Sequence, residues 1–281
     1  MKVSVIINVY NRVHLLTKAL LSLKNQSLVP DELILSDDGS QEDIPSGIQN
    51  IVSDLNFPVK FISQEHNGYR LAKCRNNGAR HATGDYLVFI DQDIVLNKTF
   101  IETFVKHRNQ KQFCVSYPIR LTQKQTDLVT DSMVESMNFS RIVTKSQIRK
   151  IKKQYLKDNF YRLLKKYRLR SMGPKLRGGV AAINRKDYET VNGYDENFQG
   201  WGNEDDDFGQ RLCRAGICGK NPFYDEFPLH LYHEPFHKKG HRVNLAYFHQ
   251  QLKELKKGVY RCQFGFDNPL DNEEIVVMTL N

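Results

Sequence analysis

The chain has 281 residues, of which 40% are hydrophobic and 26% are charged. This length and composition suffice to bury a sizeable core, and no run of about 18 apolar residues exists that would form a membrane-spanning helix. The five cysteines are an odd number without Cys-x-x-Cys spacing, which favours free thiols in a reducing compartment over a disulfide framework.

The net charge of +9 is concentrated in one segment. Between Arg141 and Arg177 the sequence has fourteen Lys or Arg residues and a single acid, Asp158. The local net charge is therefore +13, which leaves −4 for the remainder of the chain. The basic character belongs to this segment, so the overall charge is a poor guide to binding partners.

The first ninety residues alternate short apolar runs with helical patterns. The N-terminal apolar run is too short for a signal peptide and predicts a first strand. Strands are predicted at 3–9, 32–36, 59–63 and 86–90, with helices between them at about 15–25, 44–55 and 72–82. This alternation predicts a parallel, doubly wound sheet that is covered on both faces.

The second half is organised differently. Apolar residues at helical spacing within a basic stretch predict an amphipathic helix over about 142–169, and a glycine-flanked strand follows at 178–183. Four consecutive acids, Glu204 to Asp207, precede a helical pattern at 208–215, where they suit the positive end of a helix dipole. The polar stretch after Gly258 is predicted to be loosely held.

Polar and acidic residues follow three of the predicted strands. They are Tyr10-Asn11, Asp37-Asp38-Gly39-Ser40 and Asp91-Gln92-Asp93. Burying a carboxylate directly after an apolar strand costs free energy unless the group is solvated, paired or bound to a metal. An Asp-Asp-Gly sequence alone is usually only a turn, but ligands of such sheets bind beyond the carboxyl ends of the strands. Several such motifs at one sheet edge therefore indicate a binding site.

These motifs, taken in order, resemble the inverting family 2 glycosyltransferases with a GT-A fold, and in particular the transferase domains of bacterial chondroitin and hyaluronan polymerases. The segment from Trp201 to Asp205 is also similar to that of β-1,4-galactosyltransferases. The resemblance rests on the strand-end motifs above and on Gly68-Tyr69-Arg70-Leu71, Arg75-Asn76-Asn77-Gly78, Arg177-Gly178-Gly179-Val180-Ala181, Asn192-Gly193-Tyr194-Asp195-Glu196, Trp201-Gly202-Asn203-Glu204-Asp205 and Tyr232-His233-Glu234-Pro235.

The resemblance implies an α/β, Rossmann-like GT-A fold with a mixed, mostly parallel sheet flanked by helices. It implies four regions, which are a nucleotide-sugar-binding half with the metal motif at 1–140, a basic helical insertion at 141–177, an acceptor-side half with the catalytic base at 178–257, and a C-terminal tail at 258–281.

By the same resemblance, the donor is a UDP-sugar held with Mn²⁺ or Mg²⁺. Asp93 would contact the metal most directly, Asp91 would bind it through water or bind the ribose, and His233 would be a further ligand. A surface or core histidine, a solvated Arg70 and a core-packed Trp201 are the alternatives for three of the positions. The implied donor-binding residues are Asn8, Tyr10, Asp38, Arg70, Asp91, Gly179 and Trp201.

Inversion needs a base on the face of the sugar opposite the departing UDP. The resemblance assigns this role to Asp205, with Glu204 holding a sugar hydroxyl. Crowding by Asp206 and Asp207 is expected to raise the pKa of one carboxyl group. The chain departs from these relatives at Gln92, where Cys is common, and at Asn203, where Gly is common. Neither change removes a charged group.

The expected function is transfer of a hexose or N-acetylhexosamine to a hydroxyl of a surface glycan, such as a capsule or lipopolysaccharide, in the cytoplasm or at the inner face of the membrane. An inactive sugar-binding relative, a nucleotidyltransferase and a basic nucleic-acid-binding protein are the alternatives. Acidic motifs at the sheet edge would repel phosphates without a metal, so no nucleic-acid partner is expected.

Three interpretations of the segment 141–177 remain open. The segment binds an anionic membrane surface, it binds an anionic or lipid-linked glycan acceptor, or it is a helix that packs on the domain by its apolar stripe.

Overall fold

The structure is a computed structural model that describes residues 1–170, 173–176, 179–234 and 242–281. Arg177, Gly178 and Pro235, which belong to two of the sequence motifs, lie outside these residues. Within the described residues no helix is both long enough and apolar enough to cross a membrane.

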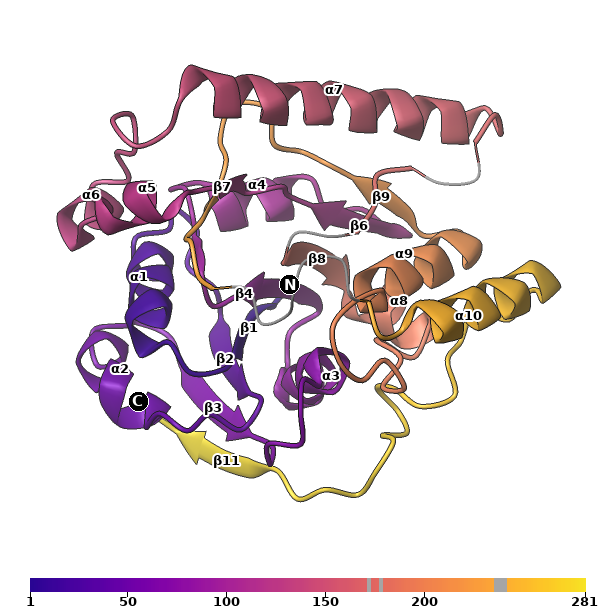
Figure 1. Cartoon of the computed structure of the whole chain (residues 1–281), viewed down its shortest axis with the longest axis horizontal. Coiled ribbons are helices and arrows are strands. Elements are labelled where there is room, and N and C mark those ends of the chain that lie inside the picture. The colour runs from indigo at the N-terminus through magenta and orange to yellow at the C-terminus, as the bar shows by residue number, and fades with distance from the viewer. Residues whose placement is uncertain (171–172, 177–178, 235–241) are drawn as a thin grey trace.

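A mixed sheet of eight strands forms the centre of the molecule (Figure 1). Four parallel strands lie in the order β3-β2-β1-β4, which confirms the predicted parallel half. The antiparallel pairs β4–β8, β8–β6 and β3–β11 make the sheet mixed, while β9 is parallel to β6. The strands are β1 Val3–Val9, β2 Glu32–Asp37, β3 Val59–Ser63, β4 Tyr86–Asp91, β6 Gln112–Val115, β8 Val180–Asn184, β9 Cys218–Lys220 and β11 Val276–Thr279.

Helices cover both faces of this sheet, as the alternation of strands and helices predicts. Side chains of β1 alternate between the two faces, so that Val5 and Ile7 pack against α1 and α2 while Ile6 packs against α3. The helices are α1 Val13–Lys24, α2 Ile44–Val52, α3 Leu71–His81, α4 Phe100–Lys106, α5 Gln123–Asp127, α6 Asp131–Glu135, α7 Lys145–Lys166, α8 Arg185–Thr190, α9 Glu204–Arg214 and α10 Leu245–Lys257.

A second, three-stranded sheet lies beside the end of β4. It has the order β5-β10-β7, with β5 at Ile94–Val95, β7 at Ile119–Arg120 and β10 at Leu229–His230. His230 is paired with Ile94, and the Leu231 amide donates to the Asp93 carbonyl at 2.9 Å. This small sheet therefore brings a distant part of the chain against the segment that follows β4.

The basic segment folds into the long helix α7, which begins at a capping box of Thr144 and Gln147. The helix lies along one edge of the molecule, outside the large sheet (Figure 1). The interpretation that its apolar stripe packs on the domain is wrong for Leu156, Phe160 and Leu163, which are exposed, whereas Ile148 and Ile151 of the same helix pack against the core. The buried residue of the helix is Asp158, which accepts hydrogen bonds from Asn221 at 3.1 Å and Gln154 at 2.8 Å.

The prediction of a loosely held C-terminal stretch is also wrong. Strand β11 pairs antiparallel with β3, and the Asn281 side chain accepts from the Val59 amide at 2.8 Å. The β11 side chains are all exposed, so the strand is held by backbone hydrogen bonds and its sequence carries no buried apolar face.

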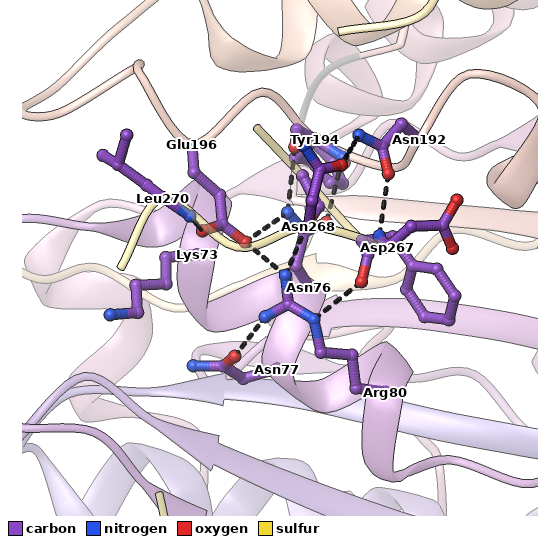
Figure 2. Close-up of polar contacts among 12 residues, drawn as sticks. Lys73, Asn76, Asn77, Arg80, Asn192, Tyr194, Glu196, Asp267, Asn268 and Leu270 are labelled. Carbon is purple, nitrogen blue, oxygen red and sulfur yellow. Dashed lines mark hydrogen bonds and ion pairs between the residues drawn. The ribbon is translucent and has the colours of Figure 1, made fainter. Parts of the chain in front are cut away.

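The residues before β11 are fixed to α3 and to the loop before α9 by polar contacts (Figure 2). Glu196 accepts from Arg80 at 2.7 Å, from Asn76 at 2.8 Å and from the Leu270 amide at 2.9 Å. The Asp267 amide donates to the Asn192 side chain at 2.8 Å. The tail therefore lies against both α3 and the loop before α9.

Candidate active site

A cleft of about 940 Å³ lies at the carboxyl ends of β1, β2 and β4. The start of α9 and the segment after β10 form its other walls. The sequence-predicted site residues that line it are Asn8, Tyr10, Asp38, Asp91, Asp93, Gly179, Trp201, Glu204, Asp205 and His233. Arg70 is the predicted site residue that the cleft lining does not include.

Asp93 lies between two histidines from the segment around β10. Its Oδ2 is 2.9 Å from Nε2 of His233, and its Oδ1 is 3.8 Å from Nε2 of His230. One ligand atom of each residue lies within 4.8 Å of the others, so the three can hold a metal ion. Burial acts to raise the pKa of Asp93, but the hydrogen bond to His233 and the nearby histidines lower it overall. The hydrogen bond to Asp93 raises the pKa of His233.

The two imidazole rings are oriented by backbone carbonyls. Nδ1 of His233 is 2.9 Å from the Glu234 carbonyl, and Nδ1 of His230 is 2.8 Å from the Leu231 carbonyl. With Nδ1 directed at a carbonyl, each ring turns Nε2 toward Asp93, an arrangement typical of histidine metal ligands. The buried Oδ1 of Asp93 has no hydrogen-bond partner. This donor set therefore fits a divalent cation.

Asp91 is held by different partners. Its Oδ1 accepts from Asn8 and from Arg75, both at 3.3 Å. Gly179 has φ +72°, and a Cβ atom there would lie 2.0 Å from Oδ2 of Asp91, so this position requires glycine. Asp91 is thus held by Asn8 and Arg75, and in the described part of the chain it does not belong to the group of ligand atoms around Asp93, which suits a contact to ribose or to water better than direct coordination of the same ion.

Gln92, between the two aspartates, holds the loop after β1. Its amide accepts from the Tyr10 backbone amide and donates to the Tyr10 carbonyl, both at 2.9 Å. The departure from cysteine at this position therefore has a structural role, because it fixes Tyr10 at the cleft wall.

Asp38 lies at the far end of the cleft beside Tyr10. Its carboxylate accepts from Gln64 at 2.5 Å and from the Arg70 backbone amide at 3.0 Å. Burial raises the pKa of Asp38 to about 6 despite these hydrogen bonds. The Tyr10 ring stacks on His66 with centroids 5.0 Å apart. A buried acceptor and an aromatic face thus lie together, the combination that recognition of a uracil ring requires.

The Arg70 guanidinium points to the C-terminal segment instead of the cleft. Its Nη1 is 2.8 Å from Glu273, and its Nη2 donates to the Glu65 carbonyl. The prediction that the Arg70 side chain contacts the donor is therefore not supported by its position. The alternative of a solvated arginine is also wrong, because the side chain is buried. Its contribution to the cleft is the backbone hydrogen bond to Asp38.

Glu204 and Asp205 lie in the first turn of α9. Asp205 accepts from Arg75 at 2.7 Å and from the Tyr194 hydroxyl at 3.3 Å. Burial raises its pKa, and the Arg75 guanidinium partly offsets this. Burial and then the charge of Asp205 raise the pKa of Glu204 to about 7, and its Oε2 lacks a hydrogen-bond partner. Both carboxylates line the cleft, where Glu204, with its pKa of about 7, can exchange a proton near neutral pH.

The crowding expected from all four acids is only partly observed. Asp206 contributes to the raised pKa of Asp205, but less than burial does. Asp207 points away and is bound by Arg211 at 2.6 Å. Trp201 is 37% exposed at the cleft, with the Arg242 guanidinium 5.9 Å from its ring centroid, so the alternative of ordinary core packing is wrong.

Two cleft residues, Arg75 and His230, were not singled out in the sequence. Arg75 belongs to a motif that carries the family resemblance, but nothing in the motif shows that its guanidinium joins Asp205 and Asp91. His230 precedes His233 by three residues, a shorter spacing than the usual one for paired histidine ligands, so the sequence holds no clear signal for it.

The fold is that of a GT-A glycosyltransferase. GalNAc-T7 in complex with UDP, GalNAc and Mn²⁺ aligns with a TM-score of 0.62 and 16% identity over 91% of this chain and 50% of that chain. Residues 1–349 of TarS from S. aureus, in complex with UDP-GlcNAc, align with a TM-score of 0.60 and 18% identity. The alignment covers 95% of this chain and 69% of that chain.

Sequence comparison defines the family. The model of glycosyl transferase family 2 matches residues 4–172, and the model described as the N-terminal domain of galactosyltransferase matches residues 158–234. The chain therefore belongs to glycosyl transferase family 2. It is 31% identical to a chondroitin synthase of Escherichia coli over 76% of its length, and 26% identical to a hyaluronan synthase of Pasteurella multocida over 76%. The chain spans 32% and 23% of the lengths of these two relatives.

Proposed function

We propose that the protein is an inverting transferase that moves a hexose or N-acetylhexosamine from a UDP-sugar to a glycan hydroxyl. The observation that supports this most is the shared cleft, in which Asp93 with two histidines and the pair Glu204–Asp205 line the same cavity. Similar folds have been solved with UDP, UDP-GlcNAc and Mn²⁺, which agrees with such a donor.

The donor end of the cleft would be formed by Asn8, Tyr10, Asp38 and Asp91. Asp38 would accept from the uracil N3–H while Tyr10 covers the ring, and Asp91 would bind the ribose. Because Asp38 is already oriented by Gln64 and by the Arg70 amide, little rearrangement is needed to bind the base. Gly179 would allow the donor sugar to approach the backbone, and Trp201 would stack on a sugar face.

Asp93, His233 and His230 would hold Mn²⁺ or Mg²⁺, with Asp91 connected through water. The nitrogen ligands favour Mn²⁺. When bound, the cation neutralises negative charge on the departing UDP. The orientation of both imidazoles by backbone carbonyls and the unpartnered Oδ1 of Asp93 support this assignment.

Asp205 would act as the general base toward the acceptor hydroxyl. Arg75 and Tyr194 both contact its Oδ1, so the carboxylate is oriented before the acceptor binds. Glu204, which is partly protonated near neutral pH, would hold a hydroxyl of either sugar. The reaction needs no covalent intermediate, because one carboxylate within hydrogen-bond distance suffices to remove the proton.

The acceptor would be a surface glycan of the capsule or lipopolysaccharide type, and the protein would act on the cytoplasmic side of the membrane. The free cysteines agree with a reducing compartment. A nucleic-acid partner is not proposed, because the carboxylates that line the cleft repel phosphates that no bound metal neutralises.

Incubation with Mn²⁺ and a panel of UDP-sugars, with UDP release as the readout, tests the proposal. One donor should release UDP in a reaction that EDTA stops and Mn²⁺ restores. Binding of a UDP-sugar without release from any donor, with acceptor glycans supplied, would favour the inactive sugar-binding relative. Consumption of nucleoside triphosphates instead would favour a nucleotidyltransferase.

A further inference from the structure

The outward side of α7 carries a line of exposed apolar residues. Leu156, Phe160 and Leu163 are 61%, 56% and 49% exposed. They are separated by four and three residues, so they lie one above the other on a single side of the helix. Lys153 and Tyr167 continue this line at its two ends, and both are exposed. Large apolar side chains gathered on one face of a charged helix indicate an interaction surface.

The inward side of α7 already has its partners. Buried Asp158 is bound by Asn221 at 3.1 Å, Arg162 donates to Gln112 at 3.2 Å, and Ile148 and Ile151 pack against the hydrophobic core. The helix therefore packs against the domain through its inward side, and the apolar residues of the outward line are not needed for that packing.

The charges on the outward side are cationic. Asp158 is the single acid between residues 141 and 177, and it is buried on the inward side. The exposed cations that flank the apolar line are Arg149, Lys150, Lys153, Lys157, Lys166, Arg168 and Arg170. A partner that covers this face must therefore accept leucine and phenylalanine side chains and also be negatively charged.

We infer that α7 docks on an anionic lipid surface. The exposed leucine and phenylalanine side chains of the outward line, flanked by lysine and arginine, suit a bilayer interface, where the apolar side chains lie below the headgroups and the cations among anionic lipids. A second copy of the chain fits less well, because two such helices would bring like charges together. A soluble anionic polymer satisfies the cations but leaves the apolar line exposed to water.

The helix is connected at both ends to segments that line the cleft. In its first turn, Gln147 donates to the Arg120 carbonyl at 3.0 Å, and beyond its last turn the Lys175 carbonyl accepts from Tyr117 at 2.8 Å. Arg120 and Lys175 both line the cleft. Docking of α7 therefore holds the cleft near the headgroups, where a lipid-linked acceptor is presented. This consequence rests on the proposed function, whereas the docking does not.

Cosedimentation with vesicles tests the inference. The chain should bind vesicles of phosphatidylcholine with phosphatidylserine, should not bind phosphatidylcholine alone, and should dissociate as salt is raised. The variant Leu156→Gln/Phe160→Gln/Leu163→Gln should bind at least about tenfold more weakly. The variant Lys153→Gln/Lys157→Gln/Lys166→Gln should bind roughly a hundredfold more weakly at low salt.

Matched controls alter exposed residues elsewhere. They are Val29→Gln/Leu128→Gln for the apolar set and Lys106→Gln/Lys253→Gln/Lys256→Gln for the cations, and both should bind like the wild type. All variants should keep the wild-type melting temperature. UDP release with a soluble acceptor should also be unchanged, which separates loss of docking from failure of the proposed function.

Equal binding to both kinds of vesicle, absence of binding, or wild-type binding by the two α7 variants would overturn the inference. Retention on heparin without vesicle binding would assign the surface to an anionic polymer instead. A dimer that the apolar α7 variant dissociates, again without vesicle binding, would assign it to self-association.

Discussion

The guanidinium of Arg75 lies 2.7 Å from the carboxylate of Asp205, so a buried cation stands directly beside the proposed base. The same guanidinium is 3.3 Å from Asp91 and lies over the Tyr194 ring at 4.9 Å. Asp91 ends a strand of the donor-side half, and Asp205 begins a helix of the acceptor-side half. Arg75 is therefore a positioning residue that fixes the two carboxylates relative to each other.

Replacement of Arg75 tests this role. In Arg75→Lys a point charge replaces the planar group that reaches both carboxylates, so kcat should fall roughly 10- to 100-fold with a smaller change in donor KM. Because Arg75 opposes the effect of burial on the pKa of Asp205, the acidic limb of the kcat–pH profile should move to higher pH. Arg80→Lys, on the same helix but bound to Glu196, is the control. An unchanged pH profile with full kcat would contradict the assignment.

Loss of the metal ligands should remove the effect of Mn²⁺ on nucleotide binding. We expect Asp93→Ala and His233→Ala to bind UDP equally with and without Mn²⁺ in calorimetry, and His230→Ala to bind Mn²⁺ at least about tenfold more weakly by electron paramagnetic resonance. His249→Ala, on the exposed side of α10, should behave like the wild type. A wild-type UDP affinity that does not respond to Mn²⁺ would count against the whole site.

Glu204 should lower stability above neutral pH. Burial raises its pKa from 4.5 to about 7, so the stability contributed by its neutral form is present below pH 4.5 and lost as pH rises through about 7. Glu204→Gln stays neutral, so it should raise the free energy of unfolding at pH 8 by roughly 1–3 kcal/mol and change little at pH 5. Urea unfolding at both pH values measures this. If Glu204→Gln raised the free energy of unfolding more at pH 5 than at pH 8, the pKa of Glu204 would not be raised by burial.

The C-terminal segment should support the uracil end of the cleft. Glu273 pairs with the buried cations of Arg70 and Lys73, and the Arg70 amide donates to Asp38. In Glu273→Gln, Arg70 loses its close ion pair and Lys73 is left to Asp271, so we expect a loss of about 1–3 kcal/mol in stability and a several-fold higher KM for the donor. Glu274→Gln changes the exposed neighbour and should leave both unchanged. If Glu273→Gln and Glu274→Gln changed stability and donor KM equally, Glu273 would not support the uracil end of the cleft.

The sequence predicted the donor-side half well, because β1 to β4 and the helices between them are long, periodic elements. The acids after β2 and β4 could be placed at one edge, since the carboxyl ends of parallel strands coincide. His230 was missed because β10 has only two residues and shows no period. The pairing of β11 depends on an open edge at β3, which no local pattern records.

Periodicity also failed to orient α7. It showed that Leu156, Phe160 and Leu163 share one side of a helix, but the same spacing is expected whether that side faces the core or solvent. The inward side carries Ile151, which packs against the core, and the buried acid Asp158, which pairs with Asn221 from a distant loop. Such pairs arise only from the tertiary fold, as does the contact of Arg75 with Asp205.

Removing the proposed base is the most direct test of the account. Asp205→Asn keeps the size of the side chain but cannot accept the acceptor proton. With the donor identified by UDP release, this variant should bind the UDP-sugar and Mn²⁺ with nearly wild-type Kd, while kcat falls roughly 10²- to 10⁴-fold. Asp206→Asn should retain most of the activity. A near wild-type kcat for Asp205→Asn would contradict the central claim that this carboxylate deprotonates the acceptor.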